Sequence, residues 1–250
     1  MTSIFIKTYV NDYKWLQYLL PSLDLYAHGF EEVILVTDEG DPPISPDVLA
    51  LLKRIPLRVI PVPFPTQCPA STDDKAVGYV WQQYIKLHWF RYCTTDSALL
   101  LDSDQLLSGP LTPDDLKYDG KWMWHYRPWS KAECGLHWKK MTDYILRFDT
   151  AYEAMPMPGF ILTRTATRRF LDYLAGGLDL WDYMILQDIN TMSEYNLYGS
   201  FLYEKGSDEY IPNISSALPH KNRLIVQRLS WGGITAEIHD ANMAILSDEQ

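Results

Sequence analysis

Short apolar runs alternate with amphipathic stretches along the first hundred residues, and this alternation limits the possible fold more than any other feature. The apolar runs predict strands at Ile4–Tyr9, 31–40, 57–62 and Ala98–Leu101. Apolar residues at helical spacing predict helices at Asp12–Ala27, 46–52 and 75–93. Strands that alternate with helices form a parallel sheet covered by its crossover helices, so we expect an α/β fold.

Two acidic residues follow the last of these strands. The run Ala98–Leu101 is apolar throughout, as in a strand buried on both faces, and Asp102 and Asp104 come next in LLLDSDQLL. Ligands of open α/β sheets bind beyond the carboxyl ends of the strands. The two carboxylates therefore predict a site for Mn²⁺ or Mg²⁺, ions that prefer oxygen ligands and bridge to substrate phosphates. The alternative is a turn in which one Asp caps the backbone and the other is solvated.

The second half of the chain is rich in aromatic residues and less regular. Its alternating aromatic residues favour core packing over stacking on a carbohydrate or a base: Trp122, Trp124, Tyr126 and Trp129. We expect strands at 122–126 and 156–163 and helices at 137–148, 164–175 and 181–194. The tail from Ser230 has weak periodicity, and we expect it to fold back over the site. No linker or internal repeat is visible, so one domain is expected over 1–250.

Composition excludes several classes of protein. A chain of 250 residues with 47% hydrophobic residues can bury a full core. No apolar run approaches the ~20 residues that span a bilayer, and the N-terminus lacks the features of a signal peptide, so we expect no membrane span and a cytoplasmic location. The three cysteines, Cys68, Cys93 and Cys134, form no CxxC pair and suggest neither a disulfide framework nor a zinc site.

The formal net charge of −10 argues against a surface that holds nucleic acid by bulk attraction. A local basic groove stays open as an alternative, because the second half contains Lys139, Lys140, Arg164, Arg168, Arg169, Lys221, Arg223 and Arg228.

Four segments in this order resemble the glycosyltransferases of the GT-A fold: QQYIKL, LLLDSDQLL, MPGFILT and SEYNLYG. The set is similar to bacterial and phage members and spans most of the chain. It implies a Rossmann-like, mostly parallel sheet flanked by helices, with a nucleotide-sugar-binding half at about 1–108 and a smaller acceptor lobe and C-terminal tail at about 109–250. It further implies a metal-dependent hexosyl- or pentosyltransferase that moves a sugar from a nucleotide-sugar, with a UDP-sugar favoured, to a hydroxyl acceptor. A phage-encoded member would work in the host cytoplasm.

On the donor side, the resemblance implies that Thr8 and Tyr9 contact the base or ribose and that Asp38 accepts hydrogen bonds from them. It places Gln83 and Lys86 near the diphosphate, and Asp102, Ser103 and Asp104 around the metal and donor. Two of these residues have simpler alternatives, because Asp38 suits a turn and Lys86 suits a solvated helix face.

The resemblance also implies a third metal ligand from the C-terminal region. His239 is the preferred candidate and His220 the second, although this chain lacks the His-Gly-Lys-Pro stretch of glycogenin-like enzymes. Either histidine is otherwise an ordinary hydrogen-bonded residue.

Two carboxylates are candidates for the chemical step, and they imply different mechanisms. Glu194 suits an inverting enzyme, in which it removes the proton of the acceptor hydroxyl. Asp188, or Gln187 beside it in QDIN, suits a retaining enzyme, in which a polar group lies beneath the sugar ring. Each could instead cap or stabilise its helix. The acceptor-side candidates are Pro158, Gly159, His125 and Tyr195.

Three other functions stay open. One is a phage-type DNA glycosyltransferase that modifies a hydroxymethylated pyrimidine, which would require an exposed or flipped base. Another is a sugar-phosphate nucleotidyltransferase, although KTYVNDYKW lacks the Gly-rich loop expected after its first strand. The third is a non-catalytic protein that binds sugar nucleotides.

Overall fold

The computed structural model describes residues 1–64, 74–132, 136–175, 192–228 and 232–247. Its central sheet has the strand order β3-β2-β1-β4-β9. Four of these strands run parallel, β1 (Thr2–Lys7), β2 (Val33–Asp38), β3 (Leu57–Val62) and β4 (Ser97–Asp102), and β9 (Phe160–Thr163) is antiparallel to β4. The chain is therefore a mixed α/β protein with a mostly parallel sheet, as predicted.

Burial along the strands explains this order. Every residue of β1 is buried, as are the first five of β2 and of β4, which is the pattern of strands covered on both faces. Strand β3 lies at the edge, contains Pro61 and exposes several of its residues. Proline is tolerated there because an edge strand leaves backbone N–H groups unpaired.

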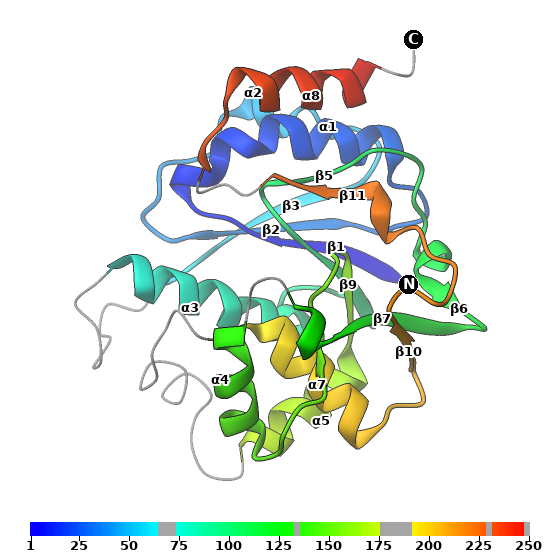
Figure 1. Ribbon diagram of the computed structural model, residues 1–250. Helices are drawn as coiled ribbons and strands as arrows, with labels where there is room; N and C mark the ends of the chain where they lie inside the picture. The colour runs from blue at the N-terminus through cyan, green and yellow to red at the C-terminus, as the bar shows by residue number, and fades with distance from the viewer. Residues whose placement is uncertain (65–73, 133–135, 176–191, 229–231, 248–250) are drawn as a thin grey trace.

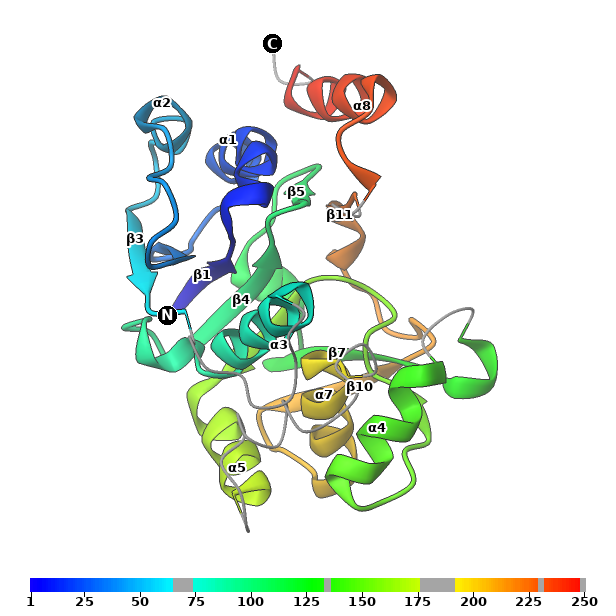
Figure 2. The same ribbon diagram turned by 90° about the vertical axis from the view of Figure 1, so that its left-hand side faces the viewer.

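Helices cover both faces of the sheet (Figures 1 and 2). On one side lie α1 (Leu16–Tyr26), which follows the 3₁₀ turn η1 (Val10–Trp15), then α2 (Pro46–Leu49) and α8 (Ala236–Ser247). On the other side lie α3 (Asp74–Leu87) and α7 (Glu194–Lys205), with α4 (Leu136–Leu146) and α5 (Arg164–Leu174) beyond them. Further 3₁₀ turns are η2 (Trp89–Arg91), η3 (Pro113–Leu116), η4 (Trp129–Lys131) and η6 (Asn222–Leu224).

Two smaller sheets complete the fold. Strand β7 (Lys121–Pro128) pairs with β6 (Lys117–Tyr118), β8 (Tyr152–Glu153) and β10 (Tyr210–Ile214), and β5 (Gln105–Leu107) pairs with β11 (Ile225–Gln227). Trp122, Trp124, Tyr126 and Trp129 are buried, which confirms their expected core role. A single cluster of buried apolar residues runs from Ile4 to Ile225 and so includes both halves of the chain.

Most predicted elements of the first half are confirmed, and the misses fall in the second half. Residues 181–191 of the helix expected at 181–194 lie outside the described residues, and the helix that the structure has, α7, begins at Glu194. Helix α7 has no amphipathic stripe because all its residues from Glu194 to Leu202 are buried, so periodicity does not identify it in the sequence.

The tail from Ser230 was expected to fold over the site, and residues 229–231, where this tail begins, lie outside the described residues. Helix α8 packs on the outer side of α1, where Ile245 O accepts a hydrogen bond of 2.7 Å from the Tyr26 hydroxyl (Figure 1). None of the helices within the described ranges is long and apolar enough to span a bilayer. Cys93 is a buried free thiol, and Cys68 and Cys134 lie outside the described residues.

Candidate functional site

The candidate site lies at the carboxyl ends of β1 and β4. Asp102 is the last residue of β4 and pairs in register with Lys7, the last residue of β1. The next two residues turn the chain into β5, and within this turn the Ser103 hydroxyl donates a 2.9 Å hydrogen bond to Thr8 Oγ1. This hydrogen bond joins the Asp-Ser-Asp turn to the residue that follows β1. It holds the two carboxylates at the rim of the sheet, by which we mean the carboxyl ends of its parallel strands, where ligands of such sheets bind.

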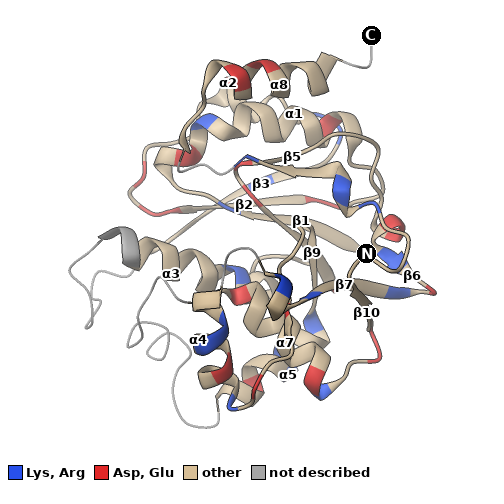
Figure 3. Cartoon of the chain, in the orientation of Figure 1, with Lys and Arg blue, Asp and Glu red and all other residues tan. Residues whose placement is uncertain are grey.

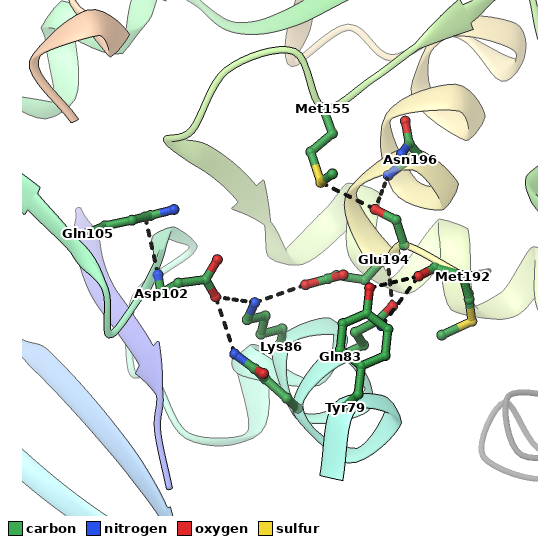
Figure 4. Close-up of polar contacts among 11 residues, drawn as sticks. Tyr79, Gln83, Lys86, Asp102, Gln105, Met155, Met192, Glu194 and Asn196 are labelled. Atoms are coloured by element: carbon green, nitrogen blue, oxygen red, sulfur yellow. Dashed lines mark hydrogen bonds and ion pairs between the residues drawn. The ribbon is translucent and has the colours of Figure 1, made fainter. Parts of the chain in front are cut away.

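A buried lysine joins this rim to the second half of the chain. Lys86, on α3, contacts the Asp102 carboxylate and lies 3.0 Å from Glu194 Oε1 at the start of α7 (Figure 4). Gln82 Nε2 donates a 3.3 Å hydrogen bond to Asp102 Oδ1. Burial alone lowers the pKa of the Lys86 ammonium, but attraction to Asp102 and then to Glu194 outweighs it, so the pKa is raised and Lys86 stays charged.

The same face of α3 holds the start of α7. Gln83 Oε1 accepts a 3.0 Å hydrogen bond from the backbone N–H of Glu194, and the Tyr79 hydroxyl donates to Met192 O at 3.1 Å. Tyr79, Gln83 and Lys86 are spaced four and three residues apart, so they form one stripe along the helix. Gln83 and Lys86 are polar, yet both are buried where α7 lies against α3.

Glu194 lies in the contact between α3 and α7. Its side chain is buried, and burial raises its pKa, although the Lys86 ammonium offsets part of the effect. A general base must be within hydrogen-bond reach of the proton that it abstracts. Glu194 instead reaches Lys86, so its described contacts suit the positioning of Lys86 and Asp102 better than the removal of an acceptor proton.

Negative charge accumulates around the Asp-Ser-Asp turn. Asp12, in η1 just after β1, has its pKa raised to about 6 by burial and then by repulsion from Asp104 and Asp102. Asp104 is itself buried, and its backbone oxygen accepts a 3.0 Å hydrogen bond from the N–H of Arg228. A carboxyl group whose pKa is raised by neighbouring carboxylates lies in a region of negative potential, and such a region favours a bound cation.

A second ion pair that involves a buried lysine lies at the ends of β1 and β2. Lys7 Nζ is 2.8 Å from Asp38 Oδ1, which also accepts a 2.9 Å hydrogen bond from Trp81 Nε1. Burial lowers the pKa of Lys7, and Asp38 offsets part of this effect. Thr8 is buried and Tyr9 is exposed at the rim beside them. Asp38 therefore has protein partners and is not a simple solvated turn residue.

The donor set at the Asp-Ser-Asp turn fits a hard divalent cation. Mg²⁺ and Mn²⁺ use one or two carboxylates and complete their coordination with water and substrate phosphates, which Asp102 and Asp104 permit. Within the described ranges, no three side chains of His, Cys, Asp or Glu are grouped so as to hold a metal ion. The expected third ligand, His239, lies on α8, where its Nδ1 is 2.8 Å from the Tyr18 hydroxyl of α1. His220 lies beside His125 instead.

Three of the acceptor-side candidates, Pro158, Gly159 and Tyr195, lie close to the end of β4. Pro158 and Gly159 directly precede β9, whose first residue, Phe160, pairs with Leu100 of β4, so both lie next to the end of β4. Gly159 has a φ of +90°, and a Cβ there would come within 2.4 Å of Ile225, so only glycine fits. Tyr195 is buried, stacks on Phe160 at a centroid distance of 3.8 Å and lies beneath the Lys86 ammonium.

Several residues at the site were not predicted. Lys7 and Trp81 hold Asp38, and Asp12 adds a third carboxylate to the turn. The only signal for Lys7 was a charge at the end of an apolar strand, which the predicted extent of that strand, to Tyr9, obscured. The candidates Asp188 and Gln187 lie outside the described residues.

The comparison with curated proteins finds no match to this chain. A family model described as a family of unknown function (DUF6492) matches residues 2–232, a range that contains every described residue of the site. The chain therefore belongs to the DUF6492 family.

Proposed function

We propose that the chain is a glycosyltransferase of the GT-A type that needs a divalent cation and moves a sugar from a nucleotide-sugar to a hydroxyl acceptor, with a UDP-sugar as the favoured donor. One observation carries the proposal: Asp102 and Asp104 lie at the carboxyl end of a buried parallel strand, beside β1, and face a local excess of carboxylates. A cation with a diphosphate is the ligand that best compensates such a rim.

In this proposal, Asp102 and Asp104 hold Mn²⁺ or Mg²⁺. The bound cation neutralises charge on the diphosphate leaving group. Lys86 and Gln82 hold Asp102 in place, and Ser103 ties the turn to Thr8, so the carboxylates are oriented before the donor binds. Preorganised groups are effective because they need no rearrangement during the reaction.

Glu194 serves as a positioning residue in this proposal, in contrast to the sequence-based expectation of a catalytic base. Its carboxylate pairs with the Lys86 ammonium, and its backbone N–H donates to Gln83. Because Lys86 also pairs with Asp102, these contacts hold the start of α7 in a fixed position relative to the turn after β4. Asp188 remains the proposed carboxylate for the chemical step.

A glycan or small-molecule acceptor is favoured over DNA. Lys and Arg are spread over several elements, including α4, α5 and the region of β6 (Figure 3). Some of those in the second half are used within the protein. Lys139 pairs with Asp143, Lys221 pairs with Asp115, and Arg164 donates to three backbone carbonyls. These contacts reduce the positive charge available to phosphates.

The donor class is testable by thermal shift with a panel of nucleotide-sugars in the presence of Mn²⁺. A ligand that binds only the native state at 100 times its Kd stabilises the protein by about 2.7 kcal/mol, a shift of several degrees. We expect a UDP-sugar to raise the Tm with Mn²⁺ and to have little effect with EDTA. If no nucleotide-sugar raises the Tm with any divalent cation, the proposal is wrong.

The two carboxylates are testable by substitution. Asp102→Asn and Asp104→Asn should each lower transfer or donor hydrolysis by roughly 100-fold or more, because several kcal/mol of charge stabilisation would be lost. Asp114→Asn is the matched control, since Asp114 is an exposed acid on η3 whose described ion pair is with Lys117. A radiolabelled-donor assay measures the rates, and near-equal rates for Asp102→Asn and Asp114→Asn would contradict the assignment.

A further inference from the structure

A pair of histidines lies in the second half of the chain, outside the carboxylate site. His125 is on β7 and His220 precedes η6, and their ring centroids are 4.6 Å apart with an interplanar angle of 67°. His125 is buried and His220 is half-buried. From the sequence, His125 was expected on the acceptor side and His220 as a second choice for the third metal ligand. His125 is joined to the Pro158–Gly159 turn through Asn222, and the proposed function gives neither histidine a role in the chemical step.

Hydrogen bonds fix the protonation of His125. The Asn222 side chain donates through Nδ2 to the backbone oxygens of Pro158 and Gly159, at 3.1 and 3.0 Å. Its Oδ1 must therefore face His125 Nε2, which is 3.0 Å away, and only a protonated Nε2 can donate to it. A neutral His125 then carries its lone pair on Nδ1.

The lone pair on His125 has no partner among the described residues. His125 Nδ1 is buried and makes no hydrogen bond, and the same is true of His220 Nδ1. Burial lowers the pKa of His125 to about 4 and also lowers the pKa of His220, and both shifts favour the neutral ring. A buried acceptor without a donor destabilises the folded state, and such a group in a native protein calls for an explanation such as a bound ion.

The spacing suits two ligands of one metal ion. Imidazoles bound through nitrogen at about 2.0–2.1 Å place their ring centres roughly 4.5–5.5 Å apart. Neutral imidazole is a preferred ligand of Zn²⁺, Cu²⁺ and Ni²⁺, whereas Mg²⁺ and Mn²⁺ prefer oxygen. The histidine pair and the Asp-Ser-Asp turn therefore select different metals.

We propose that His125 and His220 form a binding site for a borderline transition-metal ion, with Zn²⁺ as the reference case. No third protein ligand is grouped with them in the part of the chain that the structure describes, so solvent or a small ligand completes the coordination from the side of His220, which is partly exposed. Asn222 supplies the outer hydrogen bond that orients His125, as is usual for metal-bound imidazole.

Such an ion would link segments that are distant in the sequence. His125 belongs to β7, His220 to the segment before η6, and Asn222 holds the Pro158–Gly159 turn beside the end of β4. A metal at the pair would therefore tie the segment that holds His220 to the second sheet, next to the acceptor side of the candidate site. The inference does not depend on the proposed transferase function.

Titration calorimetry with Zn²⁺ on the full-length protein without an affinity tag tests the site. The Asp102→Asn variant is the background, since it removes a carboxylate that would also bind Zn²⁺. We expect one equivalent of Zn²⁺ to bind, a rise in Tm, and no such response to Mg²⁺. Co²⁺ should give a visible absorption band from coordination by nitrogen.

His220→Gln in the same background is the decisive variant because His220 is half-buried and its replacement leaves the His125–Asn222 contact in place. We expect it to weaken Zn²⁺ binding at least ~10-fold and to remove the Co²⁺ band. His137→Gln, at an exposed histidine on α4, is the matched control and should bind as the background does. Equal Zn²⁺ affinity in His220→Gln and His137→Gln would overturn the proposal, as would the absence of Zn²⁺ binding in the background.

Discussion

Two buried lysines lie at the same edge of the central sheet, and their surroundings differ in charge. Lys7, at the ends of β1 and β2, pairs with one carboxylate, Asp38, so that the pair is neutral. Lys86, at the end of β4, pairs with two carboxylates, Asp102 and Glu194. The number of carboxylates decides the outcome, because burial lowers the pKa of Lys7 whereas the two acids around Lys86 raise its pKa.

The two ends of this rim, one at Lys7 and one at Lys86, differ in net charge. At the Lys7 end, the charges of Lys7 and Asp38 balance each other, so no further ion is needed there. The Lys86 end keeps an excess of negative charge, to which Asp104 and Asp12 add. In the proposed function, a cation would bind at the end of β4, and the ends of β1 and β2 would take an uncharged part of the ligand such as a base or ribose.

Removal of Lys86 should have the largest effect on stability. Lys86→Met leaves Asp102 and Glu194 without their cation in a buried place, which typically costs about 3–5 kcal/mol. We expect the free energy of unfolding to fall by this amount in urea titrations at pH 7 with EDTA.

The double variant Lys86→Met with Glu194→Gln shows how much of the lost stability comes from unbalanced charge and how much from lost packing. Neutralising Glu194 removes one of the two unpaired acids, so a large part of the stability should return. A single variant within about 1 kcal/mol of the parent would show that the ion pairs contribute little at this site.

Removal of Lys7 should have a smaller effect. Lys7→Met leaves one carboxylate, Asp38, which keeps the hydrogen bond from Trp81 and is partly accessible to water. We expect a loss of about 1.5–3 kcal/mol in the same urea titrations, the range for a hydrogen bond to a charged group. A loss equal to or greater than that of Lys86→Met would contradict the comparison between the two lysines.

The sequence alone predicted the two acids after β4 better than it predicted the lysine that pairs with the first of them. Burial on both faces makes a parallel strand apolar throughout, so the runs that form β1, β2 and β4 and the acids after β4 were recognisable. Asp102 and Asp104 follow directly from that pattern. Lys86 was recognised through resemblance, while its spacing on α3 was equally typical of a solvated face.

The missed contacts depend on packing between distant segments. Glu194 meets Lys86 only because α7 lies against α3, and α7 is buried from Glu194 to Leu202, which removes the periodicity that would identify it. Likewise, His239 follows α8 onto α1, a placement decided by hydrogen bonds such as that of Tyr18 rather than by a local pattern. Side-chain chemistry alone therefore identified candidates, and tertiary packing decided which of them meet.

The smallest predicted change in stability concerns Asp12, and here the substitution should stabilise the protein. Its pKa is raised from 3.8 to about 6, so the folded state disfavours the ionised form. The stability that this group contributes is present below pH ~3.8 and is lost as the pH rises through about 6. Because the group is partly exposed, we expect Asp12→Asn to stabilise the protein by only about 1 kcal/mol at pH 8 with EDTA and to have no such effect near pH 3.5.

Urea titrations at the two pH values measure this difference, and Asp47→Asn on the exposed side of α2 is the control. Mn²⁺ sharpens the test, because a cation held by Asp102 and Asp104 would favour the ionised form of Asp12 and so reduce the gain at pH 8. If Asp12→Asn destabilises the protein at pH 8 without metal, the carboxylates do not repel one another as argued, and the charge excess that distinguishes the Lys86 end from the Lys7 end is absent.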